Sequence, residues 1–171
     1  DLTLMGKVLA RAAAHKGTAF VEILQNCMVF NDGAYAALTD KATREDARLV
    51  LEHGRPMVFG RQRDRGIRLR GLEAEVVALG QGGVTEADLL VHDENAPNGT
   101  LAGLLAGFEA PDYPLAMGIL RAHAAPTYDE LNARVHEEAR AARGRGDLHR
   151  LLNSGQTWTI EPNRGVEAPA H

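Results

Sequence analysis

The sequence has little cysteine, few aromatic residues and no long apolar run. A single cysteine, Cys27, excludes an internal disulfide framework and cannot form a multi-cysteine metal site by itself. Aromatic residues make up only 5% of the chain, so few large rings are available to anchor a core. No stretch approaches the ~18 to 20 apolar residues of a membrane span, and the first residues do not have the pattern expected of a signal peptide. We therefore expect a cytoplasmic protein with no membrane partner.

The remaining composition is that of a globular domain. Hydrophobic residues make up 44% and charged residues 25% of the 171 residues, which is one domain in length. The formal net charge of -4 argues against broad nucleic-acid binding. We expect residues 1–162 to form one domain and residues 163–171 a disordered tail without periodic apolar residues.

The first part of the chain predicts an α/β arrangement. Leu4, Val8 and Leu9 place apolar side chains at helical spacing, and Lys16-Gly17 ends that helix. Residues 18–24 are rich in β-branched and aromatic side chains, which favours a buried parallel strand. Thr43 is a candidate cap for a short helix through Leu51.

The middle of the chain is broken by glycine and proline and predicts a strand-and-turn excursion from the sheet. The expected strands are residues 67–69 and 75–79. A helical turn at residues 85–88, a small-residue helix at 101–108 and an edge or late strand at 114–120 follow. The clearest helix is residues 127–143, whose narrow face of Leu131, Val135 and Ala139 suits packing against its own domain.

Cys27 follows the expected strand at residues 18–24, at the end where open α/β sheets collect their functional groups. Two interpretations are open. The thiol can be an inert packing residue, as free cysteines often are, and a single thiol forms no metal-cluster motif by itself. It can be a nucleophile, although none of the seven histidines lies close in sequence.

Three other patterns favour structural interpretations. The basic run (Arg61, Arg63, Arg65, Arg68 and Arg70) is typical of a solvated face or a protected strand edge. His92-Asp93-Glu94 could supply metal ligands, but neighbours on a strand point to opposite faces, so a loop or interface role is favoured. Gly80-Gln81-Gly82-Gly83 lacks the Lys and Ser/Thr of a phosphate loop and predicts a turn.

The chain resembles the beta subunits of 2-oxoacid:ferredoxin oxidoreductases, especially the 2-oxoglutarate type, over most of its length. Each similar segment is short, but all occur in the same order. The segments are residues 17–33 around Gln25-Asn26-Cys27, Leu51-Glu52-His53-Gly54-Arg55-Pro56-Met57, Phe59-Gly60, residues 64–69, Val91-His92-Asp93-Glu94, Pro126-Thr127-Tyr128, Gly146-Asp147-Leu148 and Gly155-Gln156-Thr157-Trp158-Thr159.

The resemblance implies a cofactor role for Cys27. Family members bind thiamine diphosphate with Mg and hold a 4Fe-4S cluster, and Cys27 matches the last of the four cluster ligands. The other three cysteines and the Gly-Asp-Gly magnesium signature lie upstream in the family and are missing here. The resemblance therefore implies the carboxyl-terminal half of a thiamine-diphosphate-binding domain, with no catalytic residue of its own, inactive alone and without stably bound cofactors.

The activity implied is CoA-dependent oxidative decarboxylation of a 2-oxoacid, with 2-oxoglutarate favoured over pyruvate. The implied partners are an alpha subunit, ferredoxin and a second beta copy or homo-oligomer. Contacts are expected mainly on residues 55–71 and on the loop after Cys27, where Asn31 and Asp32 would shape the backbone. Two alternatives stay open, a non-catalytic subunit-interaction domain and an independent cysteine-dependent enzyme.

Overall fold

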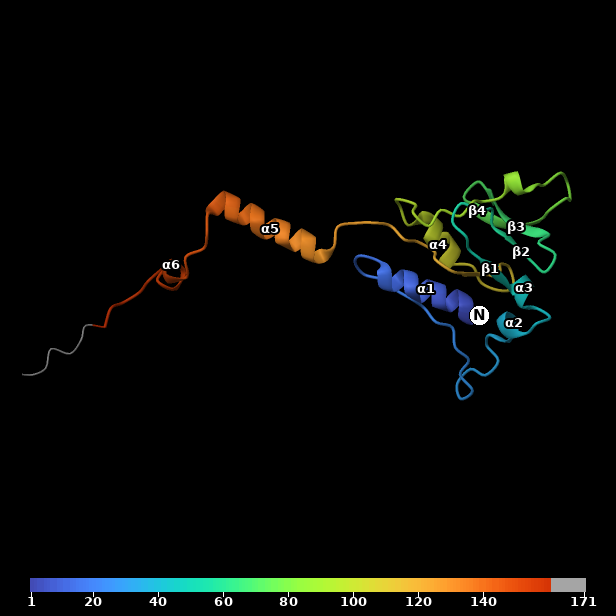
Figure 1. The fold of residues 1–171 in the computed structure, drawn as a ribbon, viewed down its shortest axis with the longest axis horizontal. Coiled ribbons are helices and arrows are strands. Elements are labelled where there is room, and N and C mark those ends of the chain that lie inside the picture. The colour runs from blue at the N-terminus through green and yellow to red at the C-terminus, as the bar shows by residue number, and fades with distance from the viewer. Residues whose placement is uncertain (161–171) are drawn as a thin grey trace, which may run out of the picture. The chain divides into compact units, whose positions relative to one another are not determined.

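The computed structural model describes residues 1–160 and shows a mixed α/β chain with two small sheets. It divides into two compact units, Asp1–Thr127 and the residues from Tyr128 onward. Both sheets lie in the first unit (Figure 1). The expected tail at residues 163–171 lies outside the described residues. No helix among residues 1–160 has the length and apolar character needed to cross a membrane.

The elements follow the chain in a simple order. The helices are α1 (Leu2–Ala14), α2 (Ala36–Thr39), α3 (Arg44–Ala47), α4 (Thr100–Ala106), α5 (Tyr128–Arg143) and α6 (Leu148–Leu152), with a 3₁₀ turn at Glu86–Asp88. The strands are β1 (Arg48–Val50), β2 (Val58–Phe59), β3 (Arg65–Arg70), β4 (Glu73–Ala78) and β5 (Leu115–Met117).

The larger sheet is the antiparallel β2-β3-β4 meander, which confirms the expected strand-and-turn region. Ile67 pairs with Val76 at the centre of the β3-β4 ladder. Ile67 is fully buried whereas Leu69 is 41% exposed, so one end of β3 enters the core and the other meets solvent. The glycine-rich stretch after β4 is a turn, as predicted, with Gly80 N donating to Val84 O at 2.9 Å.

The smaller sheet pairs β1 with β5 in parallel, with Leu49 opposite Ala116. Here the expected helix through Leu51 is wrong, because α3 ends at Ala47 and β1 begins at Arg48. Leu49 and Leu51 are buried while Val50 is 43% exposed, a two-residue alternation that only an extended strand satisfies. Thr43 precedes α3, but its hydroxyl donates to Ala37 O at 2.9 Å instead of capping the helix.

One aliphatic core with two aromatic rings joins the two sheets and α4. Its buried members are Leu49, Leu51, Met57, Phe59, Ile67, Ala74, Leu105 and Phe108. Phe108 stacks on Tyr113 with ring centroids 4.7 Å apart, and the Tyr113 hydroxyl donates to Ala74 O at 2.6 Å. The ring pair therefore closes the core against β4.

The expected buried strand at residues 18–24 is not formed. This segment is irregular, and Phe20 is 91% and Ile23 58% exposed. The helix before it forms as predicted, as α1. A strand needs a hydrogen-bonded neighbour, and among residues 1–160 no strand pairs with this segment. Residues 18–24 therefore have the composition of a strand but lack a neighbouring strand to pair with among the described residues.

The second unit contains the predicted long helix, α5, and the short α6. Leu131 and Val135 on the apolar face of α5 are 46% and 61% exposed, and no residue of α5 is buried. In α6, Asp147 caps the helix by accepting from Arg150 N at 3.0 Å, while Leu151 is 68% exposed. Neither helix has a core of its own among the described residues.

A first prediction concerns the packing of β3. A Cβ at Gly66 would lie 2.7 Å from Cδ2 of the buried Leu89, so Gly66→Ala should lower the free energy of unfolding by about 1–3 kcal/mol. The matched control is Gly6→Ala in α1, where nothing lies within 4 Å of the added Cβ and alanine favours helix. Urea unfolding of both variants tests this, and equal stabilities would contradict it.

A second prediction concerns the attachment of α1. Arg11 Nη2 donates to Glu94 Oε1 at 2.8 Å, with the two side chains 55% and 12% exposed. Arg11→Ala should cost about 0.5–1.5 kcal/mol, since partial exposure weakens the pair, and should speed amide exchange in α1. Lys7→Ala, one turn earlier on the same helix, is the control. Unchanged exchange in α1 after the Arg11 substitution would show that other contacts hold the helix.

Candidate functional site

The Cys27 loop, residues 26–33, is a tight turn held by backbone and side-chain hydrogen bonds. Asn31 N donates to Cys27 O at 2.9 Å, and the two residues form an isolated antiparallel bridge. Gly33 has φ of +75°, a conformation that glycine adopts without penalty. The loop therefore reverses the chain directly after the cysteine.

Asn26 clamps the ends of this loop together. Its Nδ2 donates to Asp32 Oδ1 at 2.9 Å, and its Oδ1 accepts from Gly33 N at 2.9 Å. The expectation that Asp32 shapes the loop is confirmed by this contact, and Asn31 contributes through its backbone. The role of Asn26 was missed by sequence reasoning, although an Asn six residues before an Asp-Gly pair is the available signal.

The Cys27 thiol is free and exposed. The pKa of this thiol is lowered, first by a hydrogen bond from the backbone N–H of Phe30 and next by one from Val29, which together outweigh the smaller effect of desolvation. Backbone N–H groups directed at sulfur favour the thiolate, which is both the nucleophilic and the metal-binding form. The exposure of Cys27 makes the inert packing interpretation wrong.

The described residues supply no complete metal site around the thiol. Among residues 1–160 no group of three or more His, Cys, Asp or Glu side chains is arranged to hold a metal ion. An iron-sulfur cluster is held by four thiolates as a rule, so the Cys27 loop can supply one of the cluster ligands and the others must come from elsewhere. The same residues include no group of carboxylates arranged to hold magnesium, so they do not form by themselves the magnesium site that accompanies thiamine diphosphate. No catalytic step is derived through either group.

His92-Asp93-Glu94 is a structural segment, as the sequence favoured. His92 is 1% exposed and its Nε2 lies 2.8 Å from Ile119 O, so Nε2 carries the proton and donates. Its Nδ1 is buried without a hydrogen-bond partner. Glu94 is engaged by Arg11, and Asp93 is exposed, which is the alternation expected of neighbours along an extended chain.

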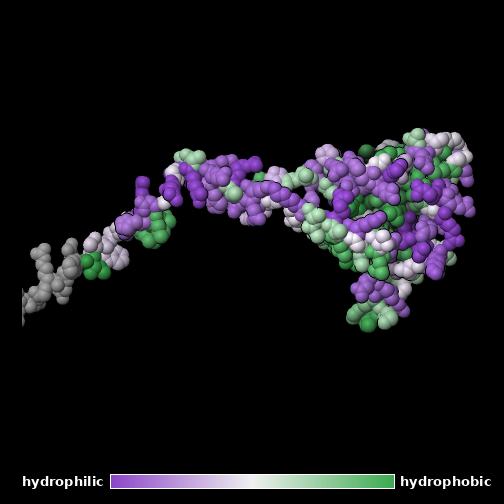
Figure 2. All heavy atoms as spheres, viewed as in Figure 1, coloured by the Kyte–Doolittle hydropathy of each residue, from purple (hydrophilic) through white to green (hydrophobic). Residues whose placement is uncertain are grey.

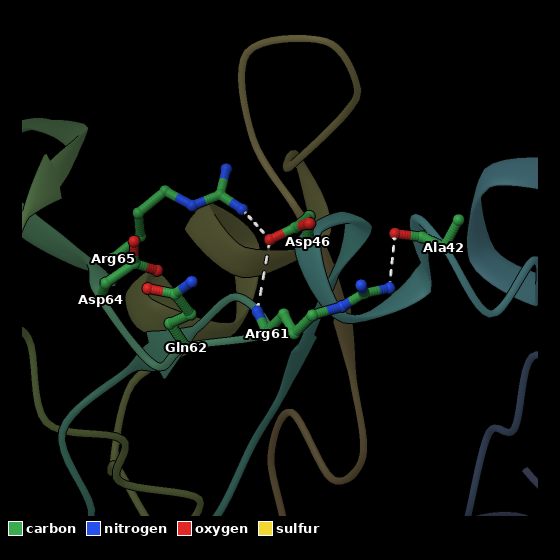
Figure 3. A pocket seen from close by; sticks show the side chains of 6 residues that line it. All are labelled: Ala42, Asp46, Arg61, Gln62, Asp64 and Arg65. Atoms are coloured by element: carbon green, nitrogen blue, oxygen red, sulfur yellow. Dashed lines mark hydrogen bonds and ion pairs between the residues drawn. The ribbon is translucent and has the colours of Figure 1, made fainter.

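The basic run is largely paired within the protein. Asp46 accepts from Arg65 Nη2 and from the backbone N–H of Arg61, in a shallow hollow also lined by Gln62 and Asp64 (Figure 3). Arg61 Nη2 donates to Lys41 O and Ala42 O at 2.8 and 2.9 Å. The Asp46 carboxylate already occupies the place that an anionic ligand would take. The hollow is therefore a structural junction between α3 and the β2-β3 turn.

The remaining arginines of the run face β4 or solvent. Arg68 pairs with Glu75 across the ladder, and Arg70 Nε lies 3.7 Å from the same carboxylate. The Arg65 guanidinium also lies 4.9 Å from the Phe59 ring centroid. These contacts agree with the expected solvated face and give no sign of a phosphate site.

Comparisons with known proteins give one informative result. No family model matches the chain, and no solved structure matches it. A curated relative, 2-oxoglutarate oxidoreductase subunit KorB of Mycobacterium tuberculosis (strain ATCC 25618 / H37Rv), is 34% identical over 164 residues. That match covers 94% of this chain but 43% of the relative, so the chain spans less than half of the KorB length. The chain is thus homologous to part of an oxidoreductase subunit, the KorB subunit of a 2-oxoglutarate oxidoreductase.

Proposed function

We propose that this chain is the carboxyl-terminal part of the beta subunit of a cytoplasmic 2-oxoacid:ferredoxin oxidoreductase, with Cys27 as one ligand of a 4Fe-4S cluster. The supporting observation is the exposed Cys27 thiol in a loop that lowers its pKa, within a chain homologous to KorB over 94% of its length. The relative is named for 2-oxoglutarate, which is therefore the proposed substrate.

In the proposed reaction a 2-oxoacid loses carbon dioxide, its acyl group passes to coenzyme A, and the released electrons pass singly to ferredoxin. Thiamine diphosphate with magnesium supplies the carbanion chemistry when bound in the intact enzyme. The residue of this chain that we propose to take part is Cys27, and the described residues hold no complete metal site of their own. The isolated chain is accordingly proposed to be inactive.

The proposed assembly includes an alpha subunit and a second beta copy, and we expect the isolated chain to self-associate or to be poorly soluble. The proposed contact surfaces are the loop after Cys27 and the exposed residues of 55–71, a range in which Met57, Phe59 and Ile67 are buried in the core. Met28, Val29 and Phe30 on that loop are 81%, 81% and 90% exposed. In Figure 2 the loop following α1 projects from the first unit and carries hydrophobic atoms at its tip. Apolar side chains exposed to this degree on an ordered turn favour burial by another chain.

A non-catalytic subunit-interaction domain is the second candidate, favoured by the exposed apolar residues of α6. Leu148, Leu151 and Leu152 are 68%, 68% and 71% exposed. The two candidates differ in iron content. The oxidoreductase subunit requires iron in the complete assembly and little in the isolated chain, whereas the interaction domain requires none in either.

A third prediction tests the ligand role of Cys27 in the assembled oxidoreductase. Cys27→Ser should lower cluster occupancy and ferredoxin reduction, because a missing thiolate leaves iron open to solvent. Iron content, the visible cluster spectrum and turnover are measured together. Met28→Leu is the control, since it changes the neighbouring exposed side chain and keeps the thiol. Wild-type iron content in the serine variant would exclude Cys27 as a ligand.

A fourth prediction concerns the thiol in the isolated chain. Because the loop lowers the pKa of Cys27, alkylation by iodoacetamide should reach its half-maximal rate at a lower pH than in the same chain unfolded in guanidinium chloride. Asn26→Ala removes both clamping hydrogen bonds and should move that midpoint upward. Ala36→Gly in the nearby α2 is the control. Identical midpoints for the folded and unfolded chains would show that the loop does not favour the thiolate.

A further inference from the structure

The helix α5 carries an apolar stripe that the described part of the chain leaves exposed. Its members, spaced three and four residues apart and so on one face of the helix, are Tyr128, Leu131, Val135, Ala139 and Ala142. All five are exposed, and no residue of α5 is buried. A narrow stripe at this spacing is the surface that one helix presents to another in a coiled coil. We call these five residues the α5 stripe.

The charged residues of α5 are divided along its length. Carboxylates predominate before Ala139 and arginines after it: Asp129, Glu130, Glu137 and Glu138 come first, and Arg140 and Arg143 follow. The helix dipole favours acidic residues in the first turn and basic residues in the last, but it does not favour Glu137 and Glu138, which lie beyond the first turn. The dipole therefore accounts for only part of the pattern. Two copies of α5 running in opposite directions would match the acidic half of each with the basic half of the other.

An antiparallel second copy of α5 also fits the stripe by size. With a twofold axis beside Val135, Leu131 of one copy faces Ala139 of the other, and Tyr128 faces Ala142. Each of these layers joins a large side chain to a small one, so the two helices can keep an even separation along the stripe. Val135 meets its own copy at the axis.

Two pairs of opposite charge flank the stripe in this arrangement. Arg134 and Glu138 lie along one side of it, and Asp129 and Arg143 lie along the other. In an antiparallel pair the same side of each helix meets, so Arg134 comes beside Glu138 of the second copy and Asp129 beside Arg143 of the second copy. Among residues 1–160 none of these four side chains forms an ion pair, so each is available to a second copy.

A parallel pair of α5 helices fits less well. Each residue would then face its own copy, so Tyr128 would meet Tyr128 and Ala139 would meet Ala139, and the layers would differ in width. The carboxylate-rich halves would also lie together, and like charges at close range repel. The size and charge patterns of α5 therefore favour the antiparallel orientation.

We propose that α5 is a self-association surface, in which two copies of this chain pair antiparallel through the α5 stripe. The inference depends on α5 alone and not on the proposed reaction, and it adds a surface to those proposed above for the second copy. The 16 residues of α5 span about 24 Å. A helix pair of this length buries less than the ~1,200 Å² of a standard interface, so pairing should be weak in the isolated chain and tighter where other contacts hold two copies together.

Mixing two charge-reversed chains tests the pairing. Arg134→Glu brings two carboxylates together at each flanking contact and Glu138→Arg brings two guanidinium groups together, so each variant alone should associate roughly ten-fold or more weakly than the wild type. An equimolar mixture should recover the wild-type dissociation constant, because each mixed contact again joins a carboxylate to a guanidinium group. Mixing cannot repair an effect on the fold of either chain. Sedimentation equilibrium of the full 171-residue chain, from micromolar to millimolar concentration, measures all of these constants.

Glu137→Arg is the matched control for the charge reversals. It makes the same change of charge on the face opposite the stripe and should leave association within about two-fold of the wild type. A wild-type chain that stays monomeric to millimolar concentration would overturn the proposal, and so would charge-reversed variants that associate like the wild type or a control that weakens association equally. A mixture that fails to recover would overturn the antiparallel arrangement.

Disulfide cross-linking tests the orientation independently. In a Cys27→Ser background, which removes the exposed native thiol, chains carrying Leu131→Cys and Ala139→Cys should form cross-linked dimers when mixed and few when oxidised separately. Cross-linking of the Leu131→Cys chain with itself would show a parallel pair and overturn the proposal. Iron content of the assembly reports the proposed function separately. An iron-containing assembly without the α5 cross-link would sink this inference alone, and a cross-linked assembly free of iron would sink the proposed function alone.

Discussion

The backbone of Met57 holds the first unit together. Its N–H donates to Leu90 O at 2.9 Å, and its carbonyl accepts from Ile67 N at 3.0 Å. Leu90 N in turn donates to Ile67 O at 2.8 Å, so three segments distant in sequence share one small network. Because the Met57 side chain is 2% exposed, these bonds lie inside the aliphatic core. The network joins the β2-β3-β4 meander to the segment before His92, and Leu49 of β1 lies in the same core cluster as Met57.

His92 extends the same network toward β5. Gly54 N donates to His92 O at 2.8 Å and His92 N donates to Arg55 O at 3.0 Å, which pairs two irregular segments like strands. The imidazole then reaches Ile119 O, just beyond β5. The buried His92 ring thus lies between its own segment and the segment at Ile119, with Nε2 hydrogen-bonded and Nδ1 without a partner. The surrounding backbone stabilises it, and no ligand is needed to account for its position.

Sequence reasoning located most elements because their signals are local. The glycine-bounded alternation around Ile67, the small-residue run of α4 and the charged helix α5 each match a short-range pattern. The failures have nonlocal causes. The sequence around β1 predicts a helix because the strand partner, β5, lies more than 60 residues away and leaves no local signal. Residues 18–24 have the propensity of a strand, but propensity does not reveal whether the hydrogen-bonded neighbour that a strand needs is present.

At the candidate site, too, some features can be predicted from the sequence and others depend on the folded geometry. The prediction of a role for Cys27 follows from its uniqueness and from the resemblance, both visible in the sequence. The lowering of its pKa by the backbone of Phe30 and Val29 is a matter of turn geometry, which the residue types alone do not specify. The coupling of Asn26 to Asp32 and Gly33 was likewise hidden, since side-chain-to-backbone bonds of this kind are recognised only when the turn is seen.

The polar clamp of Asn26 has a consequence for how the molecule tolerates change. The Cys27 loop takes its shape from contacts within residues 26–33 and shares no buried residue with the core around Met57. Substitutions that loosen the core can therefore accumulate without altering the geometry around the thiol. The converse also holds, since the loop can be reshaped without unfolding the first unit. The stability of the scaffold and the chemistry of the cysteine are in this way separately adjustable properties of one short chain.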